Sequence, residues 1–296
     1  MPSPLTRHDL LPLIRRALAE DAARHDVTSR AVLPSSLRLR ARLVARSPGI
    51  VAGGSVAAWT FHAIDPSVRC VLKRREGARV VRGETIMIIE GRARSIFAAE
   101  RVALNLIAHL SGGATLTRAF VDRIRGTRAR IYDTRKTLPS LRLLEKYAVR
   151  VGGGHNHRMD LRDAILIKTN HLRVLGHGTR NMGQVIQRAI AKARQQSPRR
   201  FIEIEATSLR EVKAALQAGP HAILLDNMPL RDIHSAVRLR NMSAGPRPMS
   251  DILLEVSGGV TLANVRAIAR AGVERISVGR LTHSAPSMDF SLHVTS

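Results

Sequence analysis

Six short apolar runs, separated by amphipathic segments, dominate the chain from Arg130 onward. The runs span residues 130–133, 164–168, 201–206, 222–226, 252–257 and 275–279, and apolar residues at helical spacing predict helices at 183–196, 208–218, 229–240 and 261–271. Strands that alternate with helices form a parallel sheet, either open or closed into a barrel. Because a full barrel needs eight strands and only six are visible, the pattern favours an incomplete α/β barrel.

The first hundred residues follow a different pattern. Residues 5–20 have apolar side chains at helical spacing, whereas 37–51 alternate apolar and Arg residues with a period of two, as a half-exposed strand does. Shorter strand-like runs follow at 68–73 and 85–90, and 95–125 is predicted to be helical with an interruption at Ser111-Gly112-Gly113. This part of the chain is therefore predicted to form a small α+β domain.

The charge of the chain is strongly positive, with 48 Lys and Arg residues against 23 Asp and Glu, a formal net charge of +25. A nucleic-acid binder has this balance, but so does an enzyme for polyanionic substrates or a protein from an Arg-biased genome. The aromatic content of 3% weakens the nucleic-acid interpretation, because proteins that bind single strands stack bases on aromatic rings. We expect neither nucleic acid nor a membrane as a partner.

Targeting and redox signals are few. The chain has no apolar run of membrane-spanning length and no apolar leader near Met1, so a cytoplasmic location is expected. The single cysteine, Cys70, excludes an internal disulfide and is expected to be a buried, inert thiol.

Reactive or charged residues fall at the carboxyl ends of the predicted strands. They are Asp133 to Lys136, Lys168, Glu205, Asp226, Ser257 and Gly279. In parallel α/β folds the ligand binds outside the carboxyl ends of the strands, and in barrels that face carries the active site. Six such positions in succession, rich in Arg and Lys, predict an anion-binding catalytic face.

Acidic residues and glycines refine this prediction. Glu203 and Glu205 face the same side of one strand, and with Asp226 they offer oxygen ligands suited to Mg²⁺; an ion pair with Arg135, Lys136 or Lys168 explains them equally well. His155 and His157 lack a third ligand at usable spacing, which argues against zinc. Ser257-Gly258-Gly259, placed directly before a predicted helix, and Gly279 after the next strand predict a phosphate site.

Several motifs together carry a family resemblance. They are Ala99-Glu100-Arg101-Val102-Ala103-Leu104-Asn105, Asp133-Thr134-Arg135-Lys136-Thr137, Leu144-Glu145-Lys146-Tyr147-Ala148-Val149, 152–158, Leu166-Ile167-Lys168 with Asn170-His171, Leu225-Asp226-Asn227 and Ser257-Gly258-Gly259. With them the chain resembles quinolinate phosphoribosyltransferase, the decarboxylating nicotinate-nucleotide pyrophosphorylase of NAD synthesis. The resemblance implies an N-terminal α/β sandwich domain at 1–108, joined by the tail 283–296, and an incomplete barrel at 109–282.

The resemblance also implies a reaction and its residues. Quinolinate and phosphoribosyl pyrophosphate would react with Mg²⁺ present to give nicotinate mononucleotide, pyrophosphate and CO₂ in a homodimer. The implied quinolinate ligands are Arg135, Lys136, His157, Arg158 and Lys168, with Arg101 supplied by the partner subunit. Lys136, Lys168, Glu205 and Asp226 are the implied catalytic residues, Glu205 and Asp226 also serving the metal, and the implied phosphate ligands are Ser257, Gly258, Gly259, Gly279, Arg280 and His283.

Some positions depart from the family pattern. Thr169 stands where Asp is usual, Leu138 and Ser140 replace Thr and Gly around Pro139, Asp160 replaces Gly, and Arg280 replaces a small residue. These departures leave a diverged relative, such as the pyrophosphorylase-like proteins associated with molybdate transport, as the alternative. A basic nucleic-acid-binding protein is the third hypothesis, and it requires an affinity that falls steeply with salt.

Overall fold

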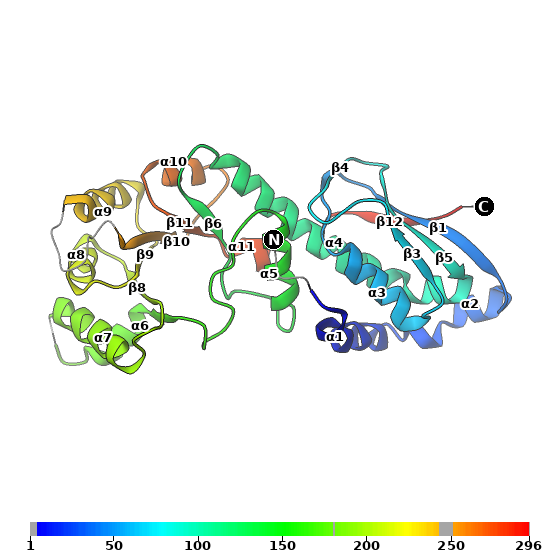
Figure 1. The fold of residues 1–296 in the computed structure, drawn as a ribbon, viewed down its shortest axis with the longest axis horizontal. Helices are drawn as coiled ribbons and strands as arrows, with labels where there is room; N and C mark the ends of the chain where they lie inside the picture. Colours follow the sequence, from blue (N-terminus) through cyan, green and yellow to red (C-terminus); the bar gives the residue numbers. More distant parts are fainter. Residues whose placement is uncertain (1–4, 180, 243–250, 296) are drawn as a thin grey trace. The chain divides into compact units, whose positions relative to one another are not determined.

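The computed structural model describes residues 5–179, 181–242 and 251–295 (Figure 1). Contacts divide the chain into two compact units. The first comprises 1–118, 137–153 and 280–296, and the second comprises 119–136 and 154–279. The domain boundary expected after residue 108 falls inside a long helix, α4 (Ala93–Arg123), which continues through Ser111-Gly112-Gly113. The predicted interruption is therefore wrong, because both glycines are accommodated inside the helix.

The first unit is built on a four-stranded antiparallel sheet with the order β12-β1-β5-β3. Its strands are β1 (Arg38–Ala45), β3 (Arg69–Leu72), β5 (Thr85–Arg92) and β12 (Phe290–Thr295), and β2 (Gly49–Ile50) pairs with β4 (Arg79–Val80). The alternation seen at the start of the chain is confirmed, since Arg38, Arg40 and Arg42 are exposed while Ala41 and Leu43 are buried. The C-terminal segment supplies the edge strand β12, which pairs with β1.

Helices bury the apolar face of this sheet. Helix α3 (Gly54–Ile64) and the first half of α4 pack against the strands through Phe61, Ile96, Met87 and their neighbours. A second cluster joins α1 (Arg7–Glu20) to α3, α4 and α5 (Arg142–Val151). Between α1 and β1 the chain forms a short 3₁₀ helix, Ala23–His25, and α2 (Val27–Val32), which Asp26 caps by accepting a hydrogen bond from Ser29 N.

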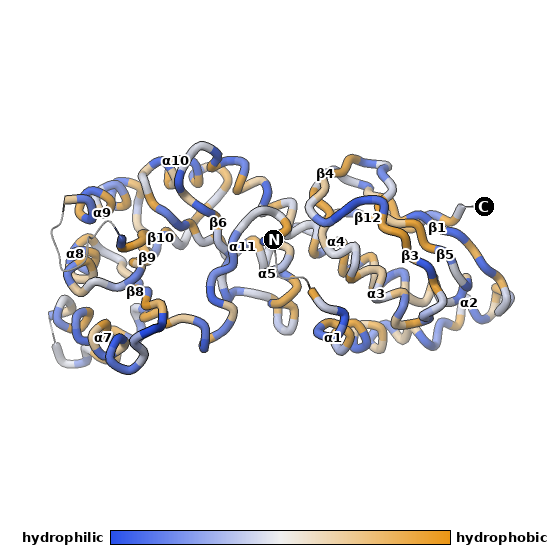
Figure 2. The backbone as a smooth tube through the Cα atoms, viewed as in Figure 1, coloured by the Kyte–Doolittle hydropathy of each residue, from blue (hydrophilic) through white to orange (hydrophobic). Residues whose placement is uncertain are grey.

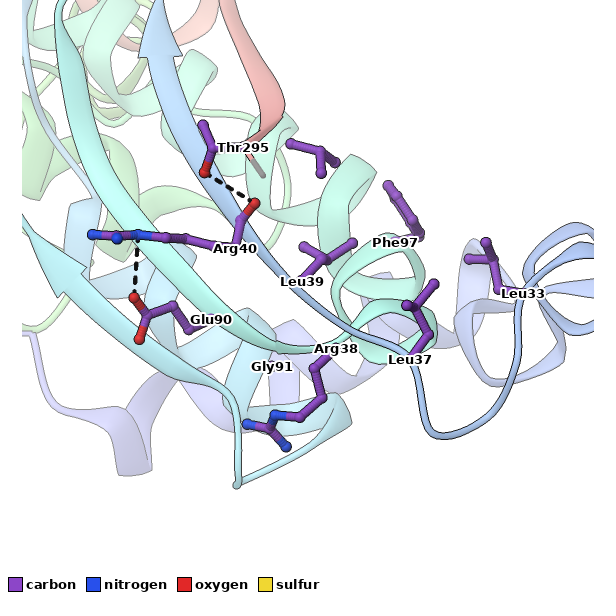
Figure 3. Close-up of a pocket in the computed structure, with 10 residues that line it drawn as sticks. Leu33, Leu37, Arg38, Leu39, Arg40, Glu90, Gly91, Phe97 and Thr295 are labelled. Atoms are coloured by element: carbon purple, nitrogen blue, oxygen red, sulfur yellow. Dashed lines mark hydrogen bonds and ion pairs between the residues drawn. The ribbon is translucent and has the colours of Figure 1, made fainter.

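An apolar groove of about 680 Å³ lies along the first unit, between β1, β5, β12 and the start of α4 (Figure 3). Leu37, Leu39, Phe97 and Val294 line it, and Arg40 closes one side through its ion pair with Glu90 at 3.2 Å. The groove contains none of the residues predicted to bind substrate. No helix within the described residues is long and apolar enough to cross a membrane.

The second unit contains the predicted six-stranded parallel sheet, in the order β6-β11-β10-β9-β8-β7. Its strands are β6 (Arg130–Tyr132), β7 (Ile165–Ile167), β8 (Ile202–Ala206), β9 (Ala222–Asp226), β10 (Leu253–Ser257) and β11 (Arg275–Ser277). From β7 to β11 each strand pairs with the next strand of the barrel along the chain, and β11 also pairs with β6. The ring is open only between β6 and β7, which confirms the incomplete barrel.

Helices of the barrel alternate with its strands. They are α6 (Thr169–Leu175), α7 (Met182–Gln196), α8 (Leu209–Ala218), α9 (Leu230–Met242) and α10 (Val265–Arg270). In Figure 2 hydrophobic and hydrophilic residues both occur along these helices, as expected for helices with one buried face. The predicted helices at 183–196, 208–218 and 229–240 agree with α7, α8 and α9, but the helix predicted at 261–271 begins only at Val265.

Candidate active site

The carboxyl ends of the barrel strands bring the predicted acidic and phosphate-binding residues to one edge. Asp226 is the last residue of β9 and lies opposite Ser257, the last residue of β10. Glu205 lies near the end of the neighbouring strand β8. Its carboxylate accepts a hydrogen bond from Thr169 N at 2.9 Å, and Thr169 Oγ1 lies 3.4 Å from the same oxygen. Thr169, a departure from the family pattern, thus donates through both of its polar groups, and the exposed Lys168 precedes it.

The loop after β10 exposes two glycines with left-handed backbone conformations. Gly258 has φ 89° and Gly259 has φ 61°, and a Cβ on Gly259 would meet nothing within 4 Å. Successive amides in such a conformation form a concave anion site. The helix N-terminus predicted here is displaced, because Asn264 accepts a hydrogen bond from Thr261 N at 2.8 Å and forms a turn before α10. The loop amides, rather than a helix end, are therefore available to a phosphate.

Two arginines lie on segments next to the edge strand β6: Arg135 follows the end of the strand, and Arg158 follows the segment that pairs with it. Burial lowers the pKa of Arg158, and the positive charge of Arg135 lowers it further. Arg158 Nη1 donates to Ala164 O at 3.1 Å. Arg135 Nε is buried and has no hydrogen-bond partner among the described residues. A buried guanidinium donor of this kind suits an anionic ligand such as a carboxylate.

The segment that carries His157 pairs with the free edge of β6. His155 N donates to Ile131 O at 2.8 Å, and Asp133 N donates to His155 O at 3.0 Å. The fully buried Asp133 then accepts hydrogen bonds from His157 N at 2.9 Å and from the Asn156 side chain. The sequence 154–158 is therefore anchored to the strand that ends next to Arg135. The ring of His155 packs on Tyr132, with centroids 5.3 Å apart.

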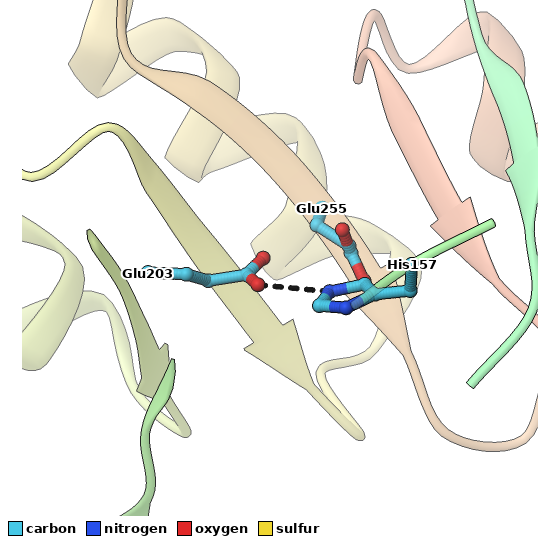
Figure 4. Close-up of side chains that lie close together, drawn as sticks. All are labelled: His157, Glu203 and Glu255. Atoms are coloured by element: carbon cyan, nitrogen blue, oxygen red, sulfur yellow. Dashed lines mark hydrogen bonds and ion pairs between the residues drawn. The ribbon is translucent and has the colours of Figure 1, made fainter. Parts of the chain in front are cut away.

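His157 points into the barrel, between carboxylates from two strands (Figure 4). Its Nε2 lies 2.9 Å from Glu203 Oε2 and 3.4 Å from Glu255 Oε1, and the two glutamates are 1% and 0% exposed. Glu255 also accepts a hydrogen bond from Ser277 Oγ and pairs with Arg275 Nε at 2.8 Å. The Arg275 guanidinium lies over the Tyr132 ring, 4.3 Å from its centroid.

Sequence analysis missed most of this interior network. It assigned Glu203 to a metal or to Arg135, Lys136 or Lys168, whereas the structure pairs Glu203 with His157. Glu255 and Arg275 were treated as parts of apolar runs. A charged residue inside a buried strand nevertheless indicates a buried partner of opposite charge, because buried charges need partners. Atoms of His157, Glu203 and Glu255 that could bind a metal lie within 4.8 Å of one another. The spacing of residues in the sequence did not reveal this group.

Electrostatics within the network depend on burial. Burial raises the pKa of Glu203, and the charge of Glu255 adds to the effect. Burial also raises the pKa of Glu255, but hydrogen bonds and charges from His157, Arg275 and Ser277 lower it overall. For His157, burial opposes protonation while the two carboxylates favour it and raise its pKa to about 9. Arg158 N donates to Nδ1 at 2.8 Å, and this hydrogen bond requires a lone pair on Nδ1. In this conformation, therefore, the ring carries its one proton on Nε2.

Four of the remaining predicted residues are exposed, and Gly279 is half-buried. Lys136 follows Arg135 in the second unit, and Gly279 ends that unit after β11. Arg101 lies on α4, and Arg280 and His283 lie on the short helix α11 (Arg280–His283), all in the first unit. The roles implied for these residues stay predictions.

Three of the departures from the family pattern can be compared with their surroundings in the structure. Ser140 has φ 65°, a conformation that favours glycine. Asp160 accepts from the Arg162 side chain at 2.6 Å. Leu138 N donates to the buried Glu145 at 3.1 Å, a bond that needs no particular side chain at 138.

Comparison with known proteins agrees with the architecture. The family model for the quinolinate phosphoribosyl transferase N-terminal domain matches residues 26–111, and that for the C-terminal domain matches 114–293. The nicotinate-nucleotide pyrophosphorylase (carboxylating) of Mycobacterium leprae is 41% identical over 282 residues, covering 94% of this chain and 95% of that protein. A probable enzyme of the same name from Bacillus subtilis is 38% identical over 97% of this chain and 93% of its own length.

A solved structure shows the same fold. The crystal structure of NadC from Streptococcus pyogenes superposes with a TM-score of 0.88 at 36% identity, covering 99% of this chain and 100% of that one. Both family models, and relatives matched over nearly their full length, therefore agree with the fold. The chain belongs to the quinolinate phosphoribosyl transferase family.

Proposed function

We propose that this protein transfers the phosphoribosyl group of phosphoribosyl pyrophosphate to quinolinate and releases pyrophosphate and CO₂, giving nicotinate mononucleotide for NAD synthesis. The observation that carries the proposal is the buried Arg135 Nε without a partner among the described residues, just past the carboxyl end of β6, in a sheet whose other strand ends carry the acids and the glycine loop. Family membership supports the same reaction. Neither the molybdate-associated alternative nor nucleic-acid binding gains support from these relatives.

Recognition of quinolinate follows from the charges. Quinolinate is a pyridine with two adjacent carboxylates, and planar guanidinium groups bind carboxylates through two parallel hydrogen bonds. The buried Nε of Arg135 has no hydrogen-bond partner in the part of the chain that the structure describes, so a carboxylate bound there would remove a desolvation penalty as well as neutralise charge. Lys136, His157 and Lys168 are the proposed additional quinolinate ligands.

Chemistry at the ribose requires stabilisation of positive charge. The quinolinate nitrogen forms a bond to C1 of the ribose while the bond from C1 to pyrophosphate breaks, and the ribose carbon becomes cationic between the two. The carboxylates of Glu205 and Asp226, at the ends of β8 and β9, are the groups proposed to stabilise that charge. The ribosylated pyridinium then withdraws electrons from the neighbouring ring carbon, which loses CO₂ and takes up a proton.

The acids at this edge fit a magnesium ion that is shared with substrate. Within the described part of the chain, Glu205 and Asp226 have no third His, Cys or acid at ligand distance. Mg²⁺ commonly keeps waters and binds through one or two carboxylates together with substrate phosphates, which suits this donor set. When bound, the ion would neutralise the leaving pyrophosphate. The amides of Gly258 and Gly259, with Ser257, are the proposed site for the 5′-phosphate, and Gly279, Arg280 and His283 are proposed to complete it.

We further propose a homodimer in which Arg101 of the partner subunit completes the carboxylate site. Its support is the motif match around Arg101 and the exposure of this side chain on α4. The cytoplasm is the proposed location, because both substrates are highly charged and do not cross membranes unaided.

A turnover assay tests the proposed reaction. Purified protein is incubated with quinolinate, phosphoribosyl pyrophosphate and Mg²⁺, and nicotinate mononucleotide is measured. Arg135→Ala should raise the quinolinate KM about 10- to 150-fold, since a hydrogen bond to a charged group contributes about 1.5–3 kcal/mol. Arg231→Ala, which removes an exposed arginine paired only with its neighbour Asp232, is the matched control and should leave kinetics unchanged. Folded wild-type protein that forms no product would refute the assignment.

A further inference from the structure

Glu145, on α5, is a buried carboxylate whose two oxygens hold two other parts of the first unit. Its Oε1 lies 3.0 Å from His109 Nε2 on α4, and its Oε2 accepts a hydrogen bond from Leu138 N at 3.1 Å. Only 2% of the Glu145 side chain is exposed. A carboxylate at this depth depends on both partners, because an uncompensated buried charge is strongly destabilising.

Water has no room to replace these partners on the side of the histidine. A small space beside the carboxylate is lined by His109, Gly113, Leu281 and Thr282, and as formed by the described residues it is too small for a water molecule. Without the carboxylate, Leu138 N would lose its acceptor and His109 Nε2 would lose its partner. The position of Glu145 is therefore tied to the position of Leu138.

Leu138 belongs to the loop 133–141, which joins β6 to α5 and carries Arg135 and Lys136. At the start of this loop the buried Asp133 accepts a hydrogen bond from His157 N at 2.9 Å. At its other end Leu141 N donates to Leu138 O at 3.1 Å, directly before α5. The loop is thus held on both sides of the two basic residues.

The distance along the chain from Leu138 to Lys136 is short. One residue spans at most about 3.6 Å, so Lys136 lies within about 7 Å of Leu138. Lys136 N also donates to Thr134 Oγ1 at 3.0 Å, which ties the middle of the loop to its start. A shift of Leu138 is therefore passed to Lys136 and, through it, to Arg135.

We propose that Glu145 is a positioning residue of the reaction. By holding Leu138 N it fixes the loop that presents Arg135 and Lys136, while His109 keeps the buried carboxylate in place. Glu145 acts through the chain and contacts no substrate itself. The proposal rests on the proposed function in taking Arg135 and Lys136 as quinolinate ligands; the hydrogen bonds that hold the loop do not depend on it.

Steady-state kinetics of two substitutions test the proposal. In Glu145→Gln the amide oxygen can still accept from Leu138 N and the NH₂ group can donate to the His109 ring, so the quinolinate KM should stay within about 2-fold of wild type. Glu145→Leu removes both contacts and should raise that KM about 5- to 10-fold, the size of one hydrogen bond. The KM for phosphoribosyl pyrophosphate should change less than about 2-fold.

Glu84→Leu is the matched control. Glu84 lies in the same unit and has the same kinds of partner, since it accepts from Val81 N at 2.9 Å and pairs with Arg74, but it does not contact the loop. Thermal melting reports the stability of each variant. A quinolinate KM that stays at the wild-type value in Glu145→Leu, or that rises equally in Glu84→Leu, would overturn the proposal, because the role would then be structural only.

Amide hydrogen exchange, measured by NMR, needs no variant and so decides even if Glu145→Leu does not fold. The Leu138 amide should exchange slowly in free wild-type protein, and saturating quinolinate should slow it further because ligand and Glu145 hold the same loop. Exchange at the rate of an unstructured chain, or no change on saturation, would overturn the proposal. If wild type neither binds nor converts quinolinate, the proposed function fails, and exchange in the free protein still decides whether Glu145 holds the loop.

Discussion

Asn227 lies against Gly258 so closely that a Cβ on Gly258 would be 2.1 Å from Asn227 Oδ1. Asn227 has φ 53°, and its N donates to Ser257 O at 2.9 Å. Two neighbouring strand ends are thus locked together at the proposed phosphate site. Only glycine fits at 258, for reasons of both space and backbone conformation.

Gly258→Ala should reduce the affinity for phosphoribosyl pyrophosphate and destabilise the fold by about 1–3 kcal/mol, the range for a strained backbone position. Gly259→Ala is the matched control, because its φ is 61° but nothing lies within 4 Å of the added Cβ. It should cost about 1 kcal/mol, the left-handed penalty alone. Calorimetry with Mg²⁺ and thermal melting measure both effects, and equal losses in the two variants would contradict the steric argument.

Neighbouring glycines of α4 should respond in opposite directions to the same substitution. A Cβ on Gly112 would lie 2.1 Å from Pro286 O, a backbone atom, so Gly112→Ala should destabilise by at least about 2 kcal/mol. The contacts of Gly113 begin at 3.4 Å, and Gly113→Ala should stabilise by up to about 1 kcal/mol because Ala is the better helix former. Urea unfolding measures both, and a stable Gly112→Ala protein would show that the tail does not pack as described.

Cys70 should resist thiol reagents in the native protein. Partial burial raises the pKa of its thiol from an ordinary value of 9.0 to about 12. Because the folded pKa is the higher one, the folded state favours the neutral thiol, and this contribution to stability is present below pH 9 and is lost as pH rises toward 12. An aromatic disulfide reagent at pH 8 should react slowly with native protein and fully after denaturation. Rapid native reaction would mean that the thiol is accessible.

The proposed sharing of Arg101 between subunits can be tested by mixing two inactive variants. Arg101→Ala and Arg135→Ala homodimers each lack one residue from every site, but a mixed dimer regains one intact site. Random reassociation should restore on the order of a quarter of wild-type activity, because half the dimers are mixed and each has one of two sites complete. No recovery after confirmed subunit exchange would indicate that both residues serve the same subunit's site.

The fold was largely predictable from local patterns. Arg and apolar residues alternate at 38–43, and six apolar runs follow later in the chain. Both patterns indicate which residues of a strand are buried, and they can be recognised within a few neighbouring residues. The interruption predicted at Gly112 and Gly113 failed because glycine has a low helix propensity but is tolerated where packing rewards it. Strand β12 had no local signal strong enough to separate it from a tail.

The spacing of apolar side chains predicts the barrel strands and therefore the polar residues at their ends. The contacts among those residues are a property of the folded chain. Glu203, Glu255 and His157 come from three separate segments, and their contact depends on the order of strands around the sheet and on the pairing of residues 154–158 with β6. That order results from long-range pairing, which no local period encodes, so the buried partners of His157 became visible only in the folded chain.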